Sequence, residues 1–113
     1  MKKSFPICDV MSVVTRRHLS PALTTEYELL AFLCGMPSVS QPSASLYEAA
    51  QRELYRQHPR LADGHMQFAM GELILFLETP SGKAEPDKLI LGWLSTQSAR
   101  LGADTFEIHG CGN

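Results

Sequence analysis

The sequence predicts a mainly α-helical fold, a compact bundle of four to five short helices. Three observations lead to this prediction: apolar residues recur at helical spacing in long segments, helix start and stop signals flank those segments, and proline and glycine gather in two loops at 35–45 and 79–86. The 113 residues suit a single domain over 1–113. A small hairpin or two-stranded sheet from residues 72–79 and 105–109 would complete an α+β architecture.

The first expected element is a short helix that starts near Pro6. Apolar side chains recur there at helical spacing, at Ile7, Val10, Met11 and Val14. The segment is also rich in β-branched residues, so a strand is the competing interpretation.

The next two helices are expected within residues 25–34 and 45–58, where start and stop signals recur. Each begins with a hydroxyl residue followed three positions later by glutamate, the pattern of a capping box: Thr25 with Glu28, and Ser45 with Glu48. Gly35 ends the first of these helices, and Pro59 ends the second.

A further helix is expected over residues 86–101. Pro86 suits the first helical position, Gly102 suits the terminator, and six residues line the inward face: Leu89, Ile90, Trp93, Leu94, Gln97 and Leu101. Residues 64–79 allow two structures. Met66, Met70, Leu73 and Leu77 follow helical spacing, whereas 72–79 alone would pass for a buried strand that pairs with 105–109.

Charge is unevenly distributed, although the net charge is only −2. Residues 1–20 hold four bases and one acid, whereas residues 61–113 hold seven acids and three bases. A polyanion would be repelled by the larger, acidic part, so general nucleic-acid binding is disfavoured.

The sequence also predicts a soluble protein of the cytoplasm. Three cysteines without a CxxC pair suit a reducing compartment. No signal-peptide core follows the N-terminal lysines, and the longest apolar run, at 73–77, is too short to span a membrane.

No arrangement of reactive residues predicts an enzyme, a cofactor or a metal site. His58, Asp63 and His65 offer three metal ligands, but loop residues separate them and helix capping is the favoured interpretation. His109 and Cys111 stand two apart near the chain end, where a base and a nucleophile are rarely held in reach. The stretch PSGK at 80–83 lacks the first glycine and the Ser or Thr of a phosphate loop.

Four flexible or aromatic side chains in residues 66–76 could form an adaptable binding stripe: Met66, Phe68, Met70 and Phe76. Core packing is the favoured interpretation for all four, because large apolar side chains are usually buried.

Four stretches follow one another in a distinctive order: FPICDVMSVVTRRHLSP, YELLAFLCG, LYRQHPRLAD and WLSTQSARLGADTFEI. Together they resemble a family of short proteins from tailed bacteriophages and prophages whose function is unassigned. The family pattern reads Pro-x-x-Asp-x-Leu-Ser-x-Thr-Thr-Gly-Arg-Leu-Leu, then Gln-His-Pro-x-Leu-Ala, then Trp-Leu-x-x-Gln-x-Ala-Arg-x-Gly. The matching residues are Pro6, Asp9, Ser12, Thr15, Arg17, Leu19, Gln57, His58, Pro59, Leu61, Ala62, Trp93, Leu94, Gln97, Ala99, Arg100 and Gly102.

The chain departs from this pattern in its opening stretch, where for example His18 stands in place of a leucine, and over a later segment. Arg16 stands where the pattern has glycine, and it would be strained if that glycine served a positive-φ turn. Residues 64–82 have no counterpart, and an added segment is a natural place for a specific partner to bind. For residues 16–18 a turn, closed by Arg17 on helix carbonyls, is favoured over a contact with an anionic partner.

The resemblance and the lack of catalytic patterns together suggest an accessory phage protein that binds a host protein or complex in the cytoplasm of the bacterial host, as a monomer or homodimer. An inhibitor of an antiviral defence component, as anti-CRISPR proteins are, would fit, because acidic proteins can fill basic grooves. A small nucleic-acid-binding regulator is the main alternative, and a metal enzyme is the other. The candidate partner-binding residues are Arg16, Arg17, His18, Glu72, Glu78, Glu85 and Asp87.

Overall fold

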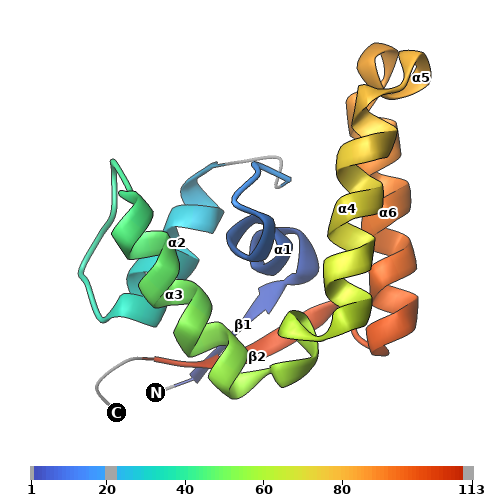
Figure 1. Cartoon of the computed structure of the whole chain (residues 1–113). Helices are drawn as coiled ribbons and strands as arrows, with labels where there is room; N and C mark the ends of the chain where they lie inside the picture. Colours follow the sequence, from blue (N-terminus) through green and yellow to red (C-terminus); the bar gives the residue numbers. More distant parts are fainter. Residues whose placement is uncertain (1, 20–22, 111–113) are drawn as a thin grey trace.

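The chain alternates short helices with loops and opens and closes with a strand, as the computed structural model in Figure 1 shows. The structure describes residues 2–19 and 23–110. Its elements in order are β1 (Lys2–Pro6), α1 (Ile7–Thr15), α2 (Leu23–Cys34), α3 (Ala44–Gln57), the 3-10 turn η1 (Pro59–Ala62), α4 (Gly64–Glu78), α5 (Pro80–Ala84), α6 (Pro86–Leu101) and β2 (Thr105–His109). The predicted mainly helical fold with a small sheet is confirmed.

The sheet has two antiparallel strands, β1 and β2, which pair from Lys2 with His109 to Pro6 with Thr105. The predicted strand at 105–109 is therefore correct, but the predicted partner at 72–79 is wrong, because those residues lie mainly in α4. Residues 2–6 escaped prediction because a strand that short becomes stable only by pairing with the distant end of the chain. The inner face of the sheet packs against the core through the buried side chains of Phe5, Phe106 and Ile108.

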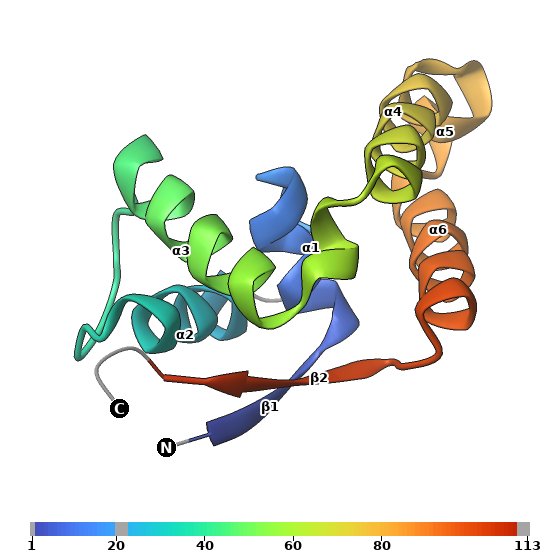
Figure 2. The same ribbon diagram turned by 60° about the horizontal axis from the view of Figure 1, so that its bottom comes forward.

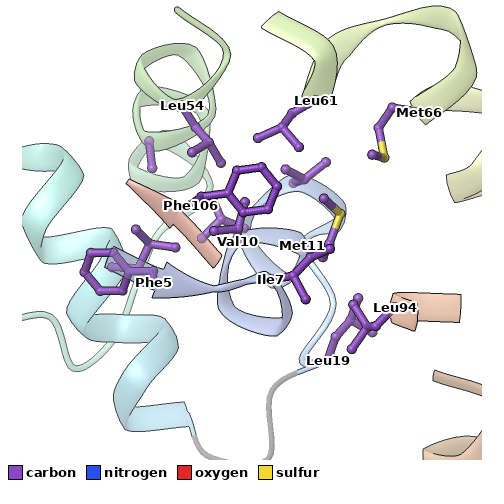
Figure 3. Packing of buried hydrophobic residues seen from close by; sticks show 14 of the residues in the cluster. Phe5, Ile7, Val10, Met11, Leu19, Leu54, Leu61, Met66, Leu94 and Phe106 are labelled. Atoms are coloured by element: carbon purple, nitrogen blue, oxygen red, sulfur yellow. The ribbon is translucent and has the colours of Figure 1, made fainter. Parts of the chain in front are cut away.

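Helix α1 lies at the centre of the molecule. Val10, Met11 and Val13 are fully buried, as expected for a helix that is apolar on nearly every side. Helices α2, α3 and α6 and both strands pack around it. Figure 3 shows Leu54 from α3 and Phe106 from β2 beside this helix. The helix interpretation of this segment was therefore correct. Its β-branched valines are buried in the core and do not indicate a strand.

Helices α4, α5 and α6 form a hairpin, called the arm below (residues 64–101). Figures 1 and 2 show α4 and α6 side by side, with the short α5 at the end away from the sheet. The Trp93 indole N–H donates to the Ala69 carbonyl at 2.8 Å, which fixes one helix against the other. Since the molecule measures 44 × 28 × 21 Å, the arm gives it an elongated outline.

The helix ends follow the sequence signals in part. Gly35 and Gly102 adopt the left-handed conformation after α2 and α6, with φ of 67° and 74°, as predicted. The N-cap of α3, however, is Ser43, whose hydroxyl accepts from the Leu46 N–H at 3.2 Å, and not Ser45. Thr25 lies inside α2 and donates its hydroxyl hydrogen bond to Asp9 at 2.9 Å, so the predicted capping box there is wrong.

The Gln-His-Pro segment ties the end of α3 to the last strand. The Gln57 side-chain amide donates to the His109 carbonyl at 2.9 Å and accepts from its N–H at 2.7 Å. His58 Nε2 lies 2.8 Å from the Glu107 carbonyl, and the Arg60 guanidinium donates to the Arg100 carbonyl at 2.9 Å. Gln57, His58 and Arg60 therefore serve as a structural joint between α3, β2 and α6.

Candidate protein-binding surface

Residues 16–18, the basic candidate segment, form mostly structural contacts. Arg16 ends α1 in the left-handed conformation, with φ 56° and ψ 30°, which is the backbone that the glycine of the family pattern suggested. Its guanidinium lies 3.3 Å from the Gln51 side-chain oxygen and 3.7 Å from the Glu48 carboxylate. The turn interpretation agrees with this geometry.

The carbonyls at the end of α1 are bonded by Gln51 rather than by Arg17. The Gln51 side-chain amide donates to the Val13 and Val14 carbonyls at 3.0 and 3.1 Å. Arg17 is exposed, and its backbone N–H donates to the Thr15 hydroxyl at 3.2 Å. The predicted closure of the helix by the Arg17 side chain is therefore wrong.

His18 belongs to a partly buried polar cluster built on Glu26. The Glu26 carboxylate is fully buried, and His18 Nδ1 lies 3.2 Å from both of its oxygens. The Tyr47 hydroxyl donates to the same carboxylate at 2.8 Å. Burial and the bond to Glu26 raise the pKa of the Tyr47 phenol, which therefore stays neutral. The cluster holds α3 and the turn after α1 against α2.

The three residues considered as metal ligands, His58, Asp63 and His65, lie apart in the structure. His58 ends α3, and Asp63 begins α4 by accepting from the Met66 N–H at 2.8 Å, both as the capping interpretation expected. His65 is exposed in the first turn of α4. Over residues 2–19 and 23–110, no three ligand side chains gather in a way that could hold a metal ion. His109 bonds through its backbone to Gln57, and Cys111 lies outside the described residues.

The acidic candidates all lie on the arm. Glu72 is half-buried on α4, Glu78 is the exposed last residue of α4, and Asp87 is exposed in the first turn of α6. Glu85 lies 3.8 Å from Lys88, and Lys83 is also exposed there. The far end of the arm is therefore of mixed charge rather than uniformly acidic.

Large apolar side chains are exposed along the same arm. Phe68 is 70% exposed, Leu75 68% and Leu91 68%, while Ile74 and Phe76 are 43% and 46% exposed. The prediction of core packing is confirmed for Met66, which is fully buried, but is wrong for Phe68 and Phe76. A usable signal was present in the sequence: once Met66, Leu73 and the others at that spacing face inward, Phe68 and Leu75 must face outward.

We name Phe68, Gly71 and Leu75 the α4 stripe. They stand at i, i+3 and i+7, so they lie on one face of α4, opposite the buried Met66, Ala69 and Leu73. A Cβ added at Gly71 would meet nothing within 4 Å, so the middle of the stripe is open. Of these three, Phe68 was considered from the sequence as part of a binding stripe but assigned to the core, whereas Gly71 and Leu75 were not among the candidates.

Two open hollows lie away from the stripe. One, of about 410 Å³, is lined mainly by α2 and the following loop, including Tyr27, Phe32, Met36 and Val39. The other, of about 290 Å³, lies over the joint made by Gln57, His58 and Arg60. The side chains of these three residues are already bonded to the backbone of the protein.

Within the described part of the chain, no helix is long and apolar enough to cross a membrane. Comparison with known proteins found no family model, no curated protein and no solved structure that matches this chain.

Proposed function

We propose that this protein acts by binding another protein and that the α4 stripe is the centre of the contact. The observation that carries the proposal is the exposure of Phe68 and Leu75, at 70% and 68%, on one face of a helix. Exposed apolar side chains gathered on one face of a soluble protein typically mark interaction sites. Aromatic anchors of this kind also supply much of the affinity of protein interfaces.

The surroundings of the stripe favour a partner with a neutral or basic rim. Glu72 and Glu78 lie on the same helix, near the middle and at the end of the stripe. Acidic groups around an apolar centre match the usual arrangement of an interface and select a partner by complementary charge.

The resemblance to short phage proteins suggests the kind of partner. We take it to be a host protein or complex, such as a component of antiviral defence that a phage protein would inhibit. Residues 64–82, which have no counterpart in the family pattern, contain α4 and most of α5. A segment added to a shared scaffold suits a partner specific to this protein.

Nucleic-acid binding through the basic segment is less well supported. The Arg16 guanidinium is engaged by Gln51 and Glu48, and His18 is engaged by Glu26. All three residues are exposed, but within the described part of the chain only the side chain of Arg17 is not engaged by another residue, and a single phosphate contact binds nucleic acid weakly.

The test compares capture of bacterial host proteins by the wild type and by a Phe68→Glu, Leu75→Glu double variant. Both positions are exposed, so the variant should fold normally and lose partners that bind the stripe. A matched control, Ser95→Glu, places a charge at an exposed position on α6 and should retain them. If the double variant captures the same proteins as the wild type with equal yield, the stripe is not the binding surface.

A further inference from the structure

Hydrogen bonding in the sheet shows which backbone groups of β1 face outward. The register of the two strands continues to Ile7, whose N–H donates to the Asp104 carbonyl at 2.9 Å. Since bonded and non-bonded residues alternate along an antiparallel pair, Phe5 and Lys3 also turn their N–H and C=O groups toward β2. The N–H and C=O groups of Ser4 therefore point the other way, to the outer edge of β1.

The outer edge of β2 is covered by the end of α3. By the same alternation, Glu107 and His109 turn their backbone groups away from β1. Gln57 bonds to both the N–H and the C=O of His109, and His58 Nε2 lies 2.8 Å from the Glu107 carbonyl. In Figure 2, β2 accordingly lies between α3 and β1. This edge of the sheet cannot accept a further strand without breaking these bonds.

The outer edge of β1, in contrast, is open. Lys2, Lys3 and Ser4 are all exposed, and the outward N–H and C=O groups of Ser4 have no hydrogen-bond partner among the residues that the structure describes. Unpaired groups on a strand edge are a template for the backbone of another extended chain. Pro6 has no N–H to donate, so the pairing is limited to the first residues of the strand.

A hollow lies beside this open edge. It is the hollow of about 410 Å³ that α2 and the following loop line, and Lys3 is the residue that β1 contributes to it. Its lining is largely apolar and includes Tyr27, Phe32, Met36 and Val39. Because side chains alternate along a strand, a chain added to β1 would turn every second side chain to the face on which Lys3 lies. The hollow can therefore receive an apolar side chain of the added strand.

Charge at this edge favours an acidic side chain next to the apolar one. The Lys3 ammonium lies 5.7 Å from the centroid of the Phe5 ring and, in the described part of the chain, forms no ion pair, whereas Lys2 is paired with Glu107 at 3.1 Å. Lys3 turns its backbone groups toward β2, so it stands at a non-hydrogen-bonded position for an added strand, where facing side chains approach closely. Glu28 also lines the hollow, so an acid is favoured only on the β1 side.

We propose that the outer edge of β1 binds an extended segment of another protein, which joins the sheet as a third strand. The segment places an acidic side chain opposite Lys3 and an apolar side chain, two positions away, in the hollow. Backbone bonds supply the affinity of such a complex, and alternate side chains supply its specificity. A second copy of this chain is a poorer occupant, because pairing β1 with β1 about Ser4 brings both Lys3 side chains to one face beside the axis, where they repel.

The test is a nuclear magnetic resonance titration of the full chain with the peptide Thr-Leu-Thr-Glu-Thr-Leu-Thr, blocked at both ends. Its Leu and Glu side chains share one face, and its order is the same from either end, so it suits a strand added in either direction. We expect a dissociation constant on the order of 1 mM, shifted amide resonances in β1 and slower hydrogen exchange at the Ser4 N–H.

A control peptide with Lys in place of Glu should bind about threefold more weakly, because it places a like charge opposite Lys3. A glutamate peptide that shifts no β1 resonance at millimolar concentration would overturn the proposal. Equal binding of the two peptides would overturn the part that Lys3 plays in it.

Two substitutions at one position test the backbone pairing. Ser4→Pro removes the outward N–H and places a ring at the edge but leaves the bonds to β2 intact, so it should weaken peptide binding at least about tenfold. Ser4→Thr keeps the N–H and should bind like the wild type. If Ser4→Pro folds and binds as tightly as Ser4→Thr, no strand is added at this edge.

A charge reversal tests the same edge without any change to the backbone. Lys3→Glu, at an exposed position, should reverse the preference between the two peptides, and an unchanged preference would contradict the proposal even if Ser4→Pro failed to fold. This surface is separate from the α4 stripe. The Phe68→Glu, Leu75→Glu variant should therefore bind the glutamate peptide like the wild type, so this inference and the proposed function can fail independently.

Discussion

At the scale of single residues, the backbone of Arg16 is the clearest source of strain. A left-handed conformation costs a residue with a Cβ about 1 kcal/mol more than it costs glycine. The contacts that Arg16 makes in return are exposed ones, with Gln51 and Glu48, and such contacts contribute little. We therefore expect Arg16→Gly to raise the free energy of unfolding by about 1 kcal/mol, measured by urea denaturation.

Arg16→Ala is the matched control for this substitution. It removes the same two side-chain contacts but keeps the Cβ, so it should be less stable than Arg16→Gly by about 1 kcal/mol. An alanine variant as stable as the glycine variant would mean that the strain is absorbed elsewhere in the turn.

The Glu26 cluster gives a second prediction at this scale, a loss of stability in alkali. The pKa of Tyr47 is raised above the ordinary phenol value of 10.0, first by burial and then by the hydrogen bond to Glu26. Below about pH 10 the phenol is neutral in both states, so its contribution is intact. As the pH rises further, the unfolded chain loses the proton while the folded chain keeps it, and the melting temperature should fall.

Tyr47→Phe should reduce this alkaline slope and also lower stability at neutral pH by about 1–3 kcal/mol, because a bond to a buried carboxylate is lost. Tyr55→Phe is the comparison. Burial also raises the pKa of Tyr55, so this variant should flatten the slope too, but without loss of the bond to Glu26. The measurement is the melting temperature of the wild type and of both variants between pH 7 and about 11. A Tyr47→Phe variant as pH-sensitive as the wild type would contradict the assignment.

At the scale of elements, the turn between α4 and α6 depends on a glycine. A Cβ at Gly82 would lie 2.0 Å from the Phe76 carbonyl oxygen and 2.9 Å from the Leu77 Cα. The backbone must shift to admit it, so Gly82→Ala should lower the free energy of unfolding by about 2 kcal/mol. Gly92→Ala, at an open helical position, should instead raise it by about 1 kcal/mol. Chemical denaturation measures the free energy of unfolding of both variants. Equal values would show that the backbone around α5 can shift to admit a Cβ at Gly82 without cost.

Elements whose limits are set by local chemistry were predictable from the sequence. Gly35, Pro59 and Gly102 end helices through their own backbone preferences, so their positions were correct. The secondary structure of residues 72–79 could not be predicted from local chemistry, because a short apolar run suits a buried strand and a helix equally. The helix forms because the core side chains of α4 pack against α6 and η1.

The candidate site was less predictable than the fold. Charge alone selected Glu72 and Glu78, which flank the α4 stripe, but the exposure of Phe68 depends on how the arm projects from the core. Arg16 and His18 were selected for their charge, and the structure gives both of them partners within the chain. Spacing along a sequence shows which residues share a face, but only tertiary packing shows which face is covered.

At the scale of the whole molecule, the protein consists of a core around α1 and the projecting arm. The core around α1 and the joint at Gln57 hold the fold together. The arm extends the molecule to 44 Å and carries exposed apolar side chains that the core does not need. The central claim is that the α4 stripe on this arm is covered by protein when the molecule works.

In-cell photo-crosslinking tests that claim most directly, with a photoreactive phenylalanine placed either at position 68 or at position 95. Position 68 lies at the start of the stripe, and position 95 is an exposed site on α6. The account predicts protein adducts from position 68, whether to a second copy or to a host protein, and few from position 95. Equal yields from the two positions, or no adduct from position 68, would contradict it.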